Sequence, residues 1–242
     1  MGHRIFLAGA SGAIGQRLIP QLLAAGHHVT GTTRSPDKAA TLRSLGIEPV
    51  IVDVFDAEVL SRRMLAARPD IVVHQLTDLP PGLDPSRMGE AVVRNARIRE
   101  EGTRNLVAAA AASGARRMVA QSIAWAYAPG PEPHGEADPL DSEASGNRGI
   151  SVGGVIALEK AVLNTPFAGV VLRYGQLYGP GTGTDAAAGA SPVHVDAAAH
   201  AALLALEKGA PGVFNVAEPN QAVSTQKAVE ELGWRADFRL PA

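Results

Sequence analysis

Two kinds of apolar pattern alternate along the chain. Short runs of consecutive apolar residues, typical of strands buried on both faces, are separated by longer stretches in which apolar residues recur every three or four positions, as on amphipathic helices. The runs predict strands over residues 4–8, 28–32, 48–53, 70–76, 117–121 and 169–173. The periodic stretches predict helices over residues 13–25, 36–45, 56–67, 90–112 and 151–163. This alternation indicates an α/β fold, a doubly wound parallel sheet with helices on both faces.

The length of the chain bounds its organisation. Its 242 residues suffice for one large domain, or for one domain with a small appendage. We expect a single domain over residues 1–242, in which residues 1–173 form the core. Residues 174–242 would complete that core and add a small C-terminal appendage. Residues 128–149 are rich in proline, glycine and polar side chains, and we expect them to form a mobile lid or a poorly ordered excursion.

The first predicted strand runs directly into a glycine-rich turn, and a helical pattern follows the turn. This order is that of the dinucleotide-binding unit in Rossmann-type sheets, where the first glycine permits the tight turn, the second lets backbone approach a pyrophosphate and the third lets the helix pack on the strand. The N-terminus of the helix adds free N–H groups and a partial positive charge. The alternative is a glycine-rich turn without a ligand. The residues expected to bind the pyrophosphate are Gly9, Ser11, Gly12, Ala13, Ile14 and Gly15.

Composition excludes several classes of protein. The 22 Lys and Arg residues nearly balance the 24 Asp and Glu residues, so nothing indicates a nucleic-acid partner. Cysteine is absent, which excludes disulfides, thiol nucleophiles and thiolate metal sites, and no histidine lies at metal-ligand spacing from a carboxylate. No signal-peptide pattern begins the chain, and no apolar run is long enough to span a membrane. We therefore expect a cytoplasmic protein that binds a small-molecule substrate and neither metal, membrane nor nucleic acid.

Four further motifs follow the glycine turn. They are Glu101-Gly-Thr-Arg-Asn-Leu-Val107, Arg116 to Ser122, Leu172-Arg-Tyr-Gly-Gln-Leu-Tyr-Gly-Pro-Gly181 and Val193-His-Val-Asp-Ala197. Together with the turn, they resemble the short-chain dehydrogenase/reductase superfamily in its extended or atypical branch, the NAD(P)-dependent epimerase/dehydratase-like proteins. The resemblance covers residues 1–217. It implies a nicotinamide dinucleotide, and a homodimer formed through the helices predicted at 90–112 and 151–163.

The end of the second predicted strand bears on the choice between NAD and NADP. An NAD site places Asp or Glu there to bind the ribose 2′-hydroxyl, whereas Gly31-Thr-Thr-Arg34 contains no acid. An acid would repel a 2′-phosphate, and the planar guanidinium of Arg34 matches one, so we expect NADP(H) in preference to NAD(H). The alternative for Arg34 is a solvated loop charge.

The resemblance also implies contacts with the rest of the cofactor. Asp53 and Val54, after the third predicted strand, correspond to the pair that contacts adenine; the alternative for Asp53 is a helix N-cap. Leu76 and Thr77 end the fourth strand, where the family lines the ribose, and Tyr174 lies at the mouth of the cofactor site.

Members of this family that reduce carbonyls use a Tyr-x-x-x-Lys pair on one helix. The tyrosine donates the proton, and the lysine binds the ribose and lowers the pKa of the tyrosine. Lys160 is the candidate lysine, but four residues earlier stands Ile156, which has no proton to give. A second departure is Arg99, which stands where the resemblance implies an asparagine.

Other residues are candidates for the missing chemistry. Ser122, at the end of the fifth predicted strand, is a candidate to bind a substrate oxygen in an oxyanion-type pocket, with a strand-end cap as the alternative. Tyr127 is the candidate replacement proton donor, and its alternative is a packing role with a satisfied hydroxyl. His134 is a third candidate, or a solvated loop histidine.

These features predict an NADP(H)-binding oxidoreductase of atypical short-chain type. Few and mostly small residues separate Gly181 from His194, which favours a small organic carbonyl or activated double bond over a sugar nucleotide. Ser122 would polarise the oxygen, Lys160 would hold the ribose, and Tyr127 or water would give the proton. Two alternatives stay open: a catalytically inactive NADP(H)-binding sensor or scaffold, and a redox-neutral cyclase or isomerase on the same fold.

Overall fold

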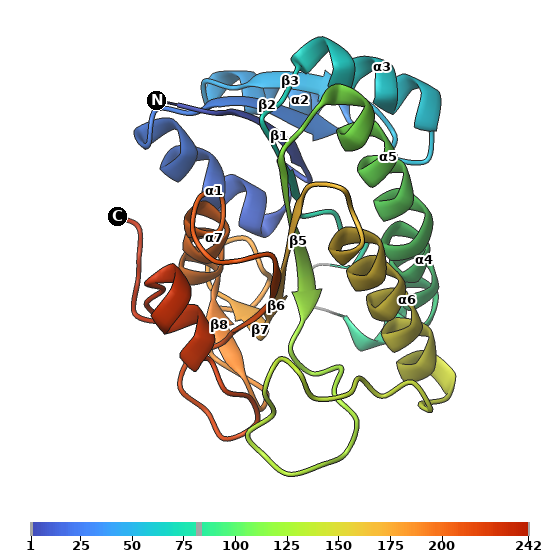
Figure 1. Cartoon of the computed structure of the whole chain (residues 1–242), viewed down its shortest axis with the longest axis vertical. Helices are drawn as coiled ribbons and strands as arrows, with labels where there is room; N and C mark the ends of the chain where they lie inside the picture. Colours follow the sequence, from blue (N-terminus) through green and yellow to red (C-terminus); the bar gives the residue numbers. More distant parts are fainter. Residues whose placement is uncertain (1, 81–83, 242) are drawn as a thin grey trace.

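A computed structural model describes residues 2–80 and 84–241 of the chain. Its centre is a seven-stranded sheet in the order β3-β2-β1-β4-β5-β6-β9, and every neighbouring pair is parallel (Figure 1). The strands are β1 (Arg4–Ala8), β2 (His28–Thr33), β3 (Glu48–Ile51), β4 (Ile71–His74), β5 (Arg117–Ile123), β6 (Ala168–Tyr174) and β9 (Gly212–Val216). The strand order reverses direction between β1 and β4, as in doubly wound folds. The predicted α/β Rossmann-type fold is confirmed.

Helices cover both faces of the sheet (Figure 1). On one face α1 packs against α7, and on the other α3 packs against α5 and α4 against α6. Two separate apolar cores result, one under each layer of helices. The helices are α1 (Ala13–Ala24), α2 (Pro36–Ser44), α3 (Ala57–Ala67), α4 (Met88–Arg97), α5 (Thr103–Ser113), α6 (Gly146–Leu163) and α7 (Val195–Leu204). No helix in the described ranges has both the length and the apolar character needed to cross a bilayer.

The structure divides the helix predicted over 90–112. A π-helical turn, Ile98–Gly102, lies between α4 and α5. At its end a Cβ on Gly102 would lie 3.1 Å from a methyl group of Val54, so the glycine lets this turn pack closely on the loop after β3. The turn changes the direction in which nearby side chains point, and such turns are frequent at functional sites.

The segment before α6 is packed on the body of the protein rather than projecting as a lid. Isolated β-bridges join Tyr127 to Leu140 and His134 to Val223. Arg148, in the first turn of α6, donates to the Asp141 carboxylate at 2.6 Å and to the carbonyl of Tyr127 at 2.9 Å. These contacts also explain why α6 begins at residue 146 rather than at 151, as the apolar pattern predicts.

The C-terminal part completes the core and adds a small sheet. Strands β7 (Gln176–Tyr178) and β8 (Pro192–His194) pair in parallel, and neither was predicted. Trp234, fully buried beneath α7, donates its indole N–H to the carbonyl of Ala197 at 2.8 Å. An aromatic anchor of this kind ties the chain end to the core, because the buried indole has both apolar contacts and a satisfied N–H.

His74, at the end of β4, makes folding stability depend on pH. Its Nδ1 accepts from the backbone N–H of Leu76 at 3.2 Å and its Nε2 lies 3.0 Å from Oγ1 of Thr103. Full burial lowers its pKa from 6.5 to about 4. As the pH falls from 6.5 to 4, His74 is protonated in the unfolded chain but stays neutral in the folded chain. We therefore expect this group to remove roughly 3 kcal/mol of stability over that window, with none lost above it.

Urea denaturation at several pH values between 7.5 and 4 measures this contribution. The His74→Gln variant should be less stable at pH 7.5 but should lose less stability on acidification, by about the amount given above. His28→Gln, at an exposed histidine, is the matched control and should keep the wild-type slope. Parallel pH curves for wild type and His74→Gln would contradict the assignment.

Candidate functional site

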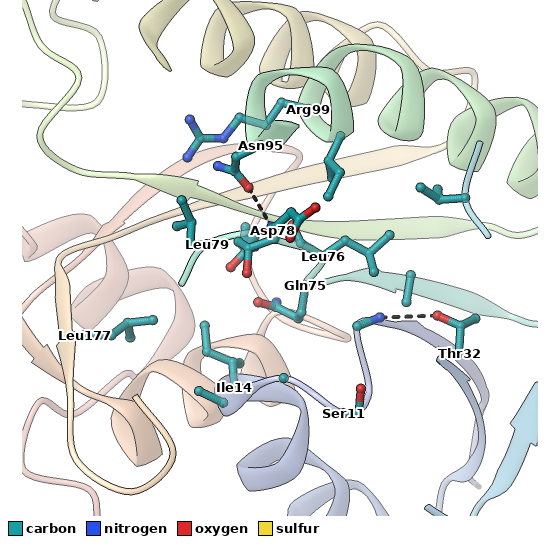
Figure 2. Close-up of a pocket in the computed structure, with 18 of the residues that line it drawn as sticks. Ser11, Ile14, Thr32, Gln75, Leu76, Asp78, Leu79, Asn95, Arg99 and Leu177 are labelled. Carbon is teal, nitrogen blue, oxygen red and sulfur yellow. Dashed lines mark hydrogen bonds between the residues drawn. The ribbon is translucent and has the colours of Figure 1, made fainter. Parts of the chain in front are cut away.

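A cavity of about 920 Å³ opens at the carboxyl ends of β1, β4, β5 and β6. This is the edge of a doubly wound sheet at which ligands bind. Figure 2 shows the glycine turn and the start of α1 on one side of the cavity, and Asn95 and Arg99 on the helical wall opposite. The end of β4, with Gln75 and Leu76, lies between them.

The glycine turn has the close backbone approach that a pyrophosphate requires. Gly9 has φ +90°, and a Cβ there would lie 2.6 Å from the backbone of Gln75. A Cβ on Gly15 would lie 2.6 Å from the carbonyl oxygen of Ala10. The Gly9 N–H donates to Oγ1 of Thr32 at 3.3 Å, which joins the turn to β2 (Figure 2). At positions 9 and 15, therefore, only glycine fits without moving the backbone.

The N-terminus of α1 faces the same space. Its N-cap is Gly12, which has no side chain to cap the first turn. The N–H groups of the first turn therefore remain available to an outside acceptor, with the positive end of the helix dipole behind them. Every residue predicted to bind the pyrophosphate except Gly15 lines the cavity, and Gly15 supports the turn from behind.

A buried polar atom beneath the turn also points to a polar ligand. Gln75 is 5% exposed, and its Oε1 has no hydrogen-bond partner in the described part of the chain. Its Nε2 donates weakly to the hydroxyl of Tyr174 at 3.5 Å, and burial raises the pKa of that tyrosine well above its usual value. An orphaned amide oxygen in a cavity floor is costly unless a ligand or water satisfies it. The residues present therefore fit a dinucleotide.

The outer end of the cavity carries positive charge. Arg34 and Lys38 line its rim, are exposed, and form no ion pair with another described residue. Strand β2 ends in Thr32 and Thr33, so no acid stands at the strand tip, and the nearest acid in the sequence is Asp37 in the first turn of α2. This combination suits an anionic group at the ribose.

The loop after β3 supplies an apolar wall with one carboxylate. Val54 is buried and lines the cavity, as do Leu76 and Thr77 across from it. Asp53 is exposed, and its Oδ1 accepts from the N–H of Phe55 at 3.0 Å. The N-cap of α3 is Asp56, so the alternative of Asp53 as a helix N-cap is wrong.

Ser122 lies in the cavity wall, but its proton is already used. Its hydroxyl donates to Oε1 of Glu159 at 2.8 Å. The same carboxylate accepts from Nε and Nη2 of Arg173 at 2.9 and 2.7 Å, and all three residues are buried. A carboxylate only accepts hydrogen bonds, so the Ser122 oxygen presents lone pairs to the cavity. As placed, it cannot polarise a substrate carbonyl in the predicted way.

The structure does not bring Tyr127 to the cavity. Its hydroxyl donates to Oδ1 of Asn215 at 2.7 Å and accepts from Nη1 of Arg173 at 2.8 Å. Its ring stacks on His134, with 4.9 Å between the ring centroids. Burial is the main cause that raises the pKa of Tyr127. The tyrosine is a packing residue with a satisfied hydroxyl, and neither it nor His134 is placed to give a proton to a ligand.

Lys160 lies outside the cavity too. The side of α6 that faces the cavity differs from the side on which the sequence pattern places the candidate lysine. The helix presents Ser151 to the cavity. Lys160 follows nine positions later, and at about 100° per residue this puts it on the opposite, exposed side of the helix. Ile156 packs beside Val155, away from the cavity. Ser151 therefore occupies the cavity-facing position that corresponds to the tyrosine of Tyr-x-x-x-Lys, and Val155, four residues later, occupies the position of the lysine.

Two residues of the helical wall complete the site. Asn95 is buried, and its Oδ1 accepts from the N–H of Asp78 at 3.1 Å (Figure 2). Arg99 is 7% exposed and donates from Nη1 to both oxygens of Ser151, each at 3.1 Å. Burial lowers the pKa of Arg99 to about 10. Among residues 2–80 and 84–241, no three His, Asp or Glu side chains gather as metal ligands.

Sequence comparisons relate this chain to nucleotide-binding proteins. The profile of a family described as NAD(P)H-binding matches residues 9–147. Over 244 aligned positions the chain is 40% identical to the 3-diazoavenalumate denitrifying reductase of a Streptomyces species. That match covers 92% of this chain and 78% of the relative.

Solved structures share the fold. A UDP-glucose 4-epimerase from Thermotoga maritima, in a structure with UDP-glucose, superposes with a TM-score of 0.77 at 20% identity, over 97% of this chain and 94% of the other. A UDP-glucose 4-epimerase from Stenotrophomonas maltophila, with NAD and formylated UDP-arabinopyranose, superposes with a TM-score of 0.78 at 14% identity, over 98% and 94%. The structural resemblance to the extended short-chain branch is confirmed at the level of the fold.

Proposed function

Since this chain belongs to the NAD(P)H-binding family, we propose that it is an NADP(H)-dependent reductase whose small organic substrate takes no proton from the protein. The glycine turn and the first turn of α1 would hold the pyrophosphate. Val54 and Asp53 would contact the adenine, and Arg34 would contact the 2′-phosphate. When bound, NADPH supplies a hydride at the inner end of the cavity.

The observation that carries this proposal is the hydrogen bond from Ser122 to Glu159. Reduction of a carbonyl or of an activated double bond consumes a proton along with the hydride, and such enzymes place a donor near the reacting atom. Here the Ser122 proton is committed to a carboxylate and Tyr127 is enclosed elsewhere. Position 151 holds a serine, whose hydroxyl is a far weaker acid than the phenol of a tyrosine. For a carbonyl or activated double bond, water would have to give the proton. The site therefore suits an acceptor that needs hydride alone.

A diazo group is such an acceptor. The Streptomyces relative is named for reductive removal of nitrogen from a diazo-bearing carboxylate. When an arenediazonium group is replaced by hydrogen, one hydride is consumed, a carbon–nitrogen bond breaks, a carbon–hydrogen bond forms and N₂ leaves. No proton enters this balance. The oxygen of Ser122 and the amide oxygen of Gln75 face the substrate as hydrogen-bond acceptors. Acceptors stabilise a cationic group and repel a developing oxyanion.

Isotope labelling tests the proposal. With 4-diazoniobenzoate as probe and NADPH deuterated at the transferring position, we expect N₂ release and benzoate that carries one deuterium. The same reaction in D₂O with unlabelled NADPH should give benzoate without deuterium. The rate must exceed that of NADPH and the probe without protein. Faster reduction of an aldehyde panel than of the diazonium compound would overturn the proton-free proposal, and NADPH binding without any turnover would favour the inactive sensor.

The preference for NADP(H) is tested at the cavity rim. Arg34→Ala should weaken NADPH binding by about tenfold, because one charge-assisted contact with a phosphate is lost, while NADH binding should hardly change. Calorimetry with both cofactors gives the ratio. Arg43→Ala, at an exposed arginine in the last turn of α2, is the control and should leave both affinities unchanged. If wild type binds NADH as tightly as NADPH, the preference is wrong.

A further inference from the structure

The helical wall of the cavity holds a positive charge that lies apart from the expected positions of the cofactor phosphates. Arg99 is buried, yet it belongs to the cavity lining. In Figure 2 it lies on the side opposite to Ser11 and Ile14. The phosphate groups of the cofactor are expected at the glycine turn and at Arg34, so the charge of Arg99 is left for another ligand.

Most hydrogen-bond donors of Arg99 are unused. A guanidinium group has five N–H donors in a rigid fork. Its Nη1 donates to the carbonyl and hydroxyl oxygens of Ser151. Its Nε and Nη2 make no hydrogen bond to another residue within 2–80 and 84–241. These two nitrogens are not enclosed, because among the described residues the enclosed polar side-chain atom without a partner is Oε1 of Gln75. Nε and Nη2 of Arg99 are therefore accessible from the cavity, where an acceptor from outside the protein can reach them.

Arg99 also forms no ion-pair contact in the described part of the chain, although the charge of Glu159 lies near enough to oppose the lowering of its pKa. Both oxygens of Glu159 are bound by Arg173. Asp78, a carboxylate of the cavity wall, pairs with Arg94 at 3.4 Å. With its pKa at about 10, Arg99 keeps its charge at neutral pH. A charged and unpaired guanidinium facing a cavity is the chemistry that recognises an anion.

Apolar side chains line the same cavity as this charge. Ile123 is the last residue of β5 and Trp125 follows that strand, while Met88 and Val92 belong to α4. All four line the cavity, and Trp125 is 38% exposed. Flat and aliphatic groups of this kind bury a planar apolar body. One fixed charge within an apolar wall is typical of a site that orients a small organic ion.

We propose that Arg99 binds the carboxylate of the substrate, and that the substrate is therefore a planar organic acid with its apolar body against Ile123 and Trp125. This inference rests on the proposed function, since it names the substrate class of the same site. The guanidinium fork matches a carboxylate. Because Oγ of Ser151 accepts from Nη1 of Arg99, the Ser151 proton stays available to the same anion.

The test compares trans-cinnamate with its uncharged amide, trans-cinnamamide, by calorimetry on the NADP⁺-loaded protein. Wild type should bind the carboxylate at least about tenfold more tightly, as expected for a charge-assisted hydrogen bond. Arg99→Gln should abolish this preference. Arg99→Lys keeps the charge but loses the fork, and should retain part of it. Arg104→Gln, at an exposed arginine on α5, is the control and should retain all of it.

The affinity for NADP⁺ is measured on each variant first, and an unchanged value in Arg99→Gln shows that the variant folds. If that variant does not fold, the wild-type comparison and Arg99→Lys still decide. Three outcomes would overturn the inference. Wild type could bind the two compounds equally, cinnamate could show no saturable binding, or the preference for the carboxylate could survive in Arg99→Gln. A protein that does not bind NADP⁺ refutes the proposed function itself, whereas one that binds NADP⁺ without preferring the carboxylate refutes only the role of Arg99.

Discussion

Gly15→Ala should weaken NADPH binding by about 100-fold. The added methyl group would lie 2.6 Å from the carbonyl oxygen of Ala10, and that oxygen belongs to backbone that cannot swing aside. The turn must then move away from α1. At least two N–H contacts with the pyrophosphate would be lost, and at about 1.5 kcal/mol or more for each charge-assisted bond this gives the stated factor. Calorimetric titration with NADPH measures it.

The matched control for this variant is Gly153→Ala. Gly153 lies within α6, is exposed, and has no heavy atom within 4 Å of an added Cβ. Alanine there should leave NADPH affinity unchanged and should stabilise the helix by roughly 0.5–1 kcal/mol. A Gly15→Ala protein that binds NADPH like wild type would show that the turn does not hold the pyrophosphate, and the cofactor assignment would then fail.

The second large effect concerns folding rather than binding. Glu159→Gln should destabilise the protein by about 3–5 kcal/mol, because the side chain of Arg173 would keep its charge in the core without a partner. Glu159 and Arg173 are 5% and 4% exposed and meet through two parallel hydrogen bonds. The loss should appear as a lower urea midpoint with an unchanged slope.

Two comparisons separate this effect from a general cost of removing a carboxylate. Glu58→Gln breaks the exposed pair of Glu58 with Arg62 on α3 and should cost less than about 1 kcal/mol. The double variant Glu159→Leu with Arg173→Met removes both charges, and should be more stable than Glu159→Gln alone. A loss below about 1 kcal/mol in Glu159→Gln would mean that the buried pair is not intact in solution.

The start and the rotation of α6 differ from those that the sequence pattern predicts. The apolar pattern predicts a helix from 151, and Lys160 is its one basic residue near the spacing that the family resemblance implies. The helix instead begins at 146, held there by contacts of Arg148 with Asp141 and with backbone. Its rotation about its axis is set by packing against α4, where a Cβ on residue 154 would lie 3.0 Å from Cα of Ala96, so Gly154 permits the close packing. That rotation places Ser151 at the cavity.

What could be known from the residue order was local. The glycine turn, the absence of an acid at the end of β2 and the alternation of strands and helices depend on neighbouring residues and on backbone sterics, and these gave the Rossmann-type fold and a nucleotide site. The hydrogen bonding of the polar groups at the site, in contrast, depends on residues that are distant in the sequence. Ser122 meets Glu159 from 37 positions away, and Arg99 meets Ser151 from 52. A polar group's free donors and acceptors are those its neighbours in space leave unused, so the chemistry of this site became visible only after the chain was folded.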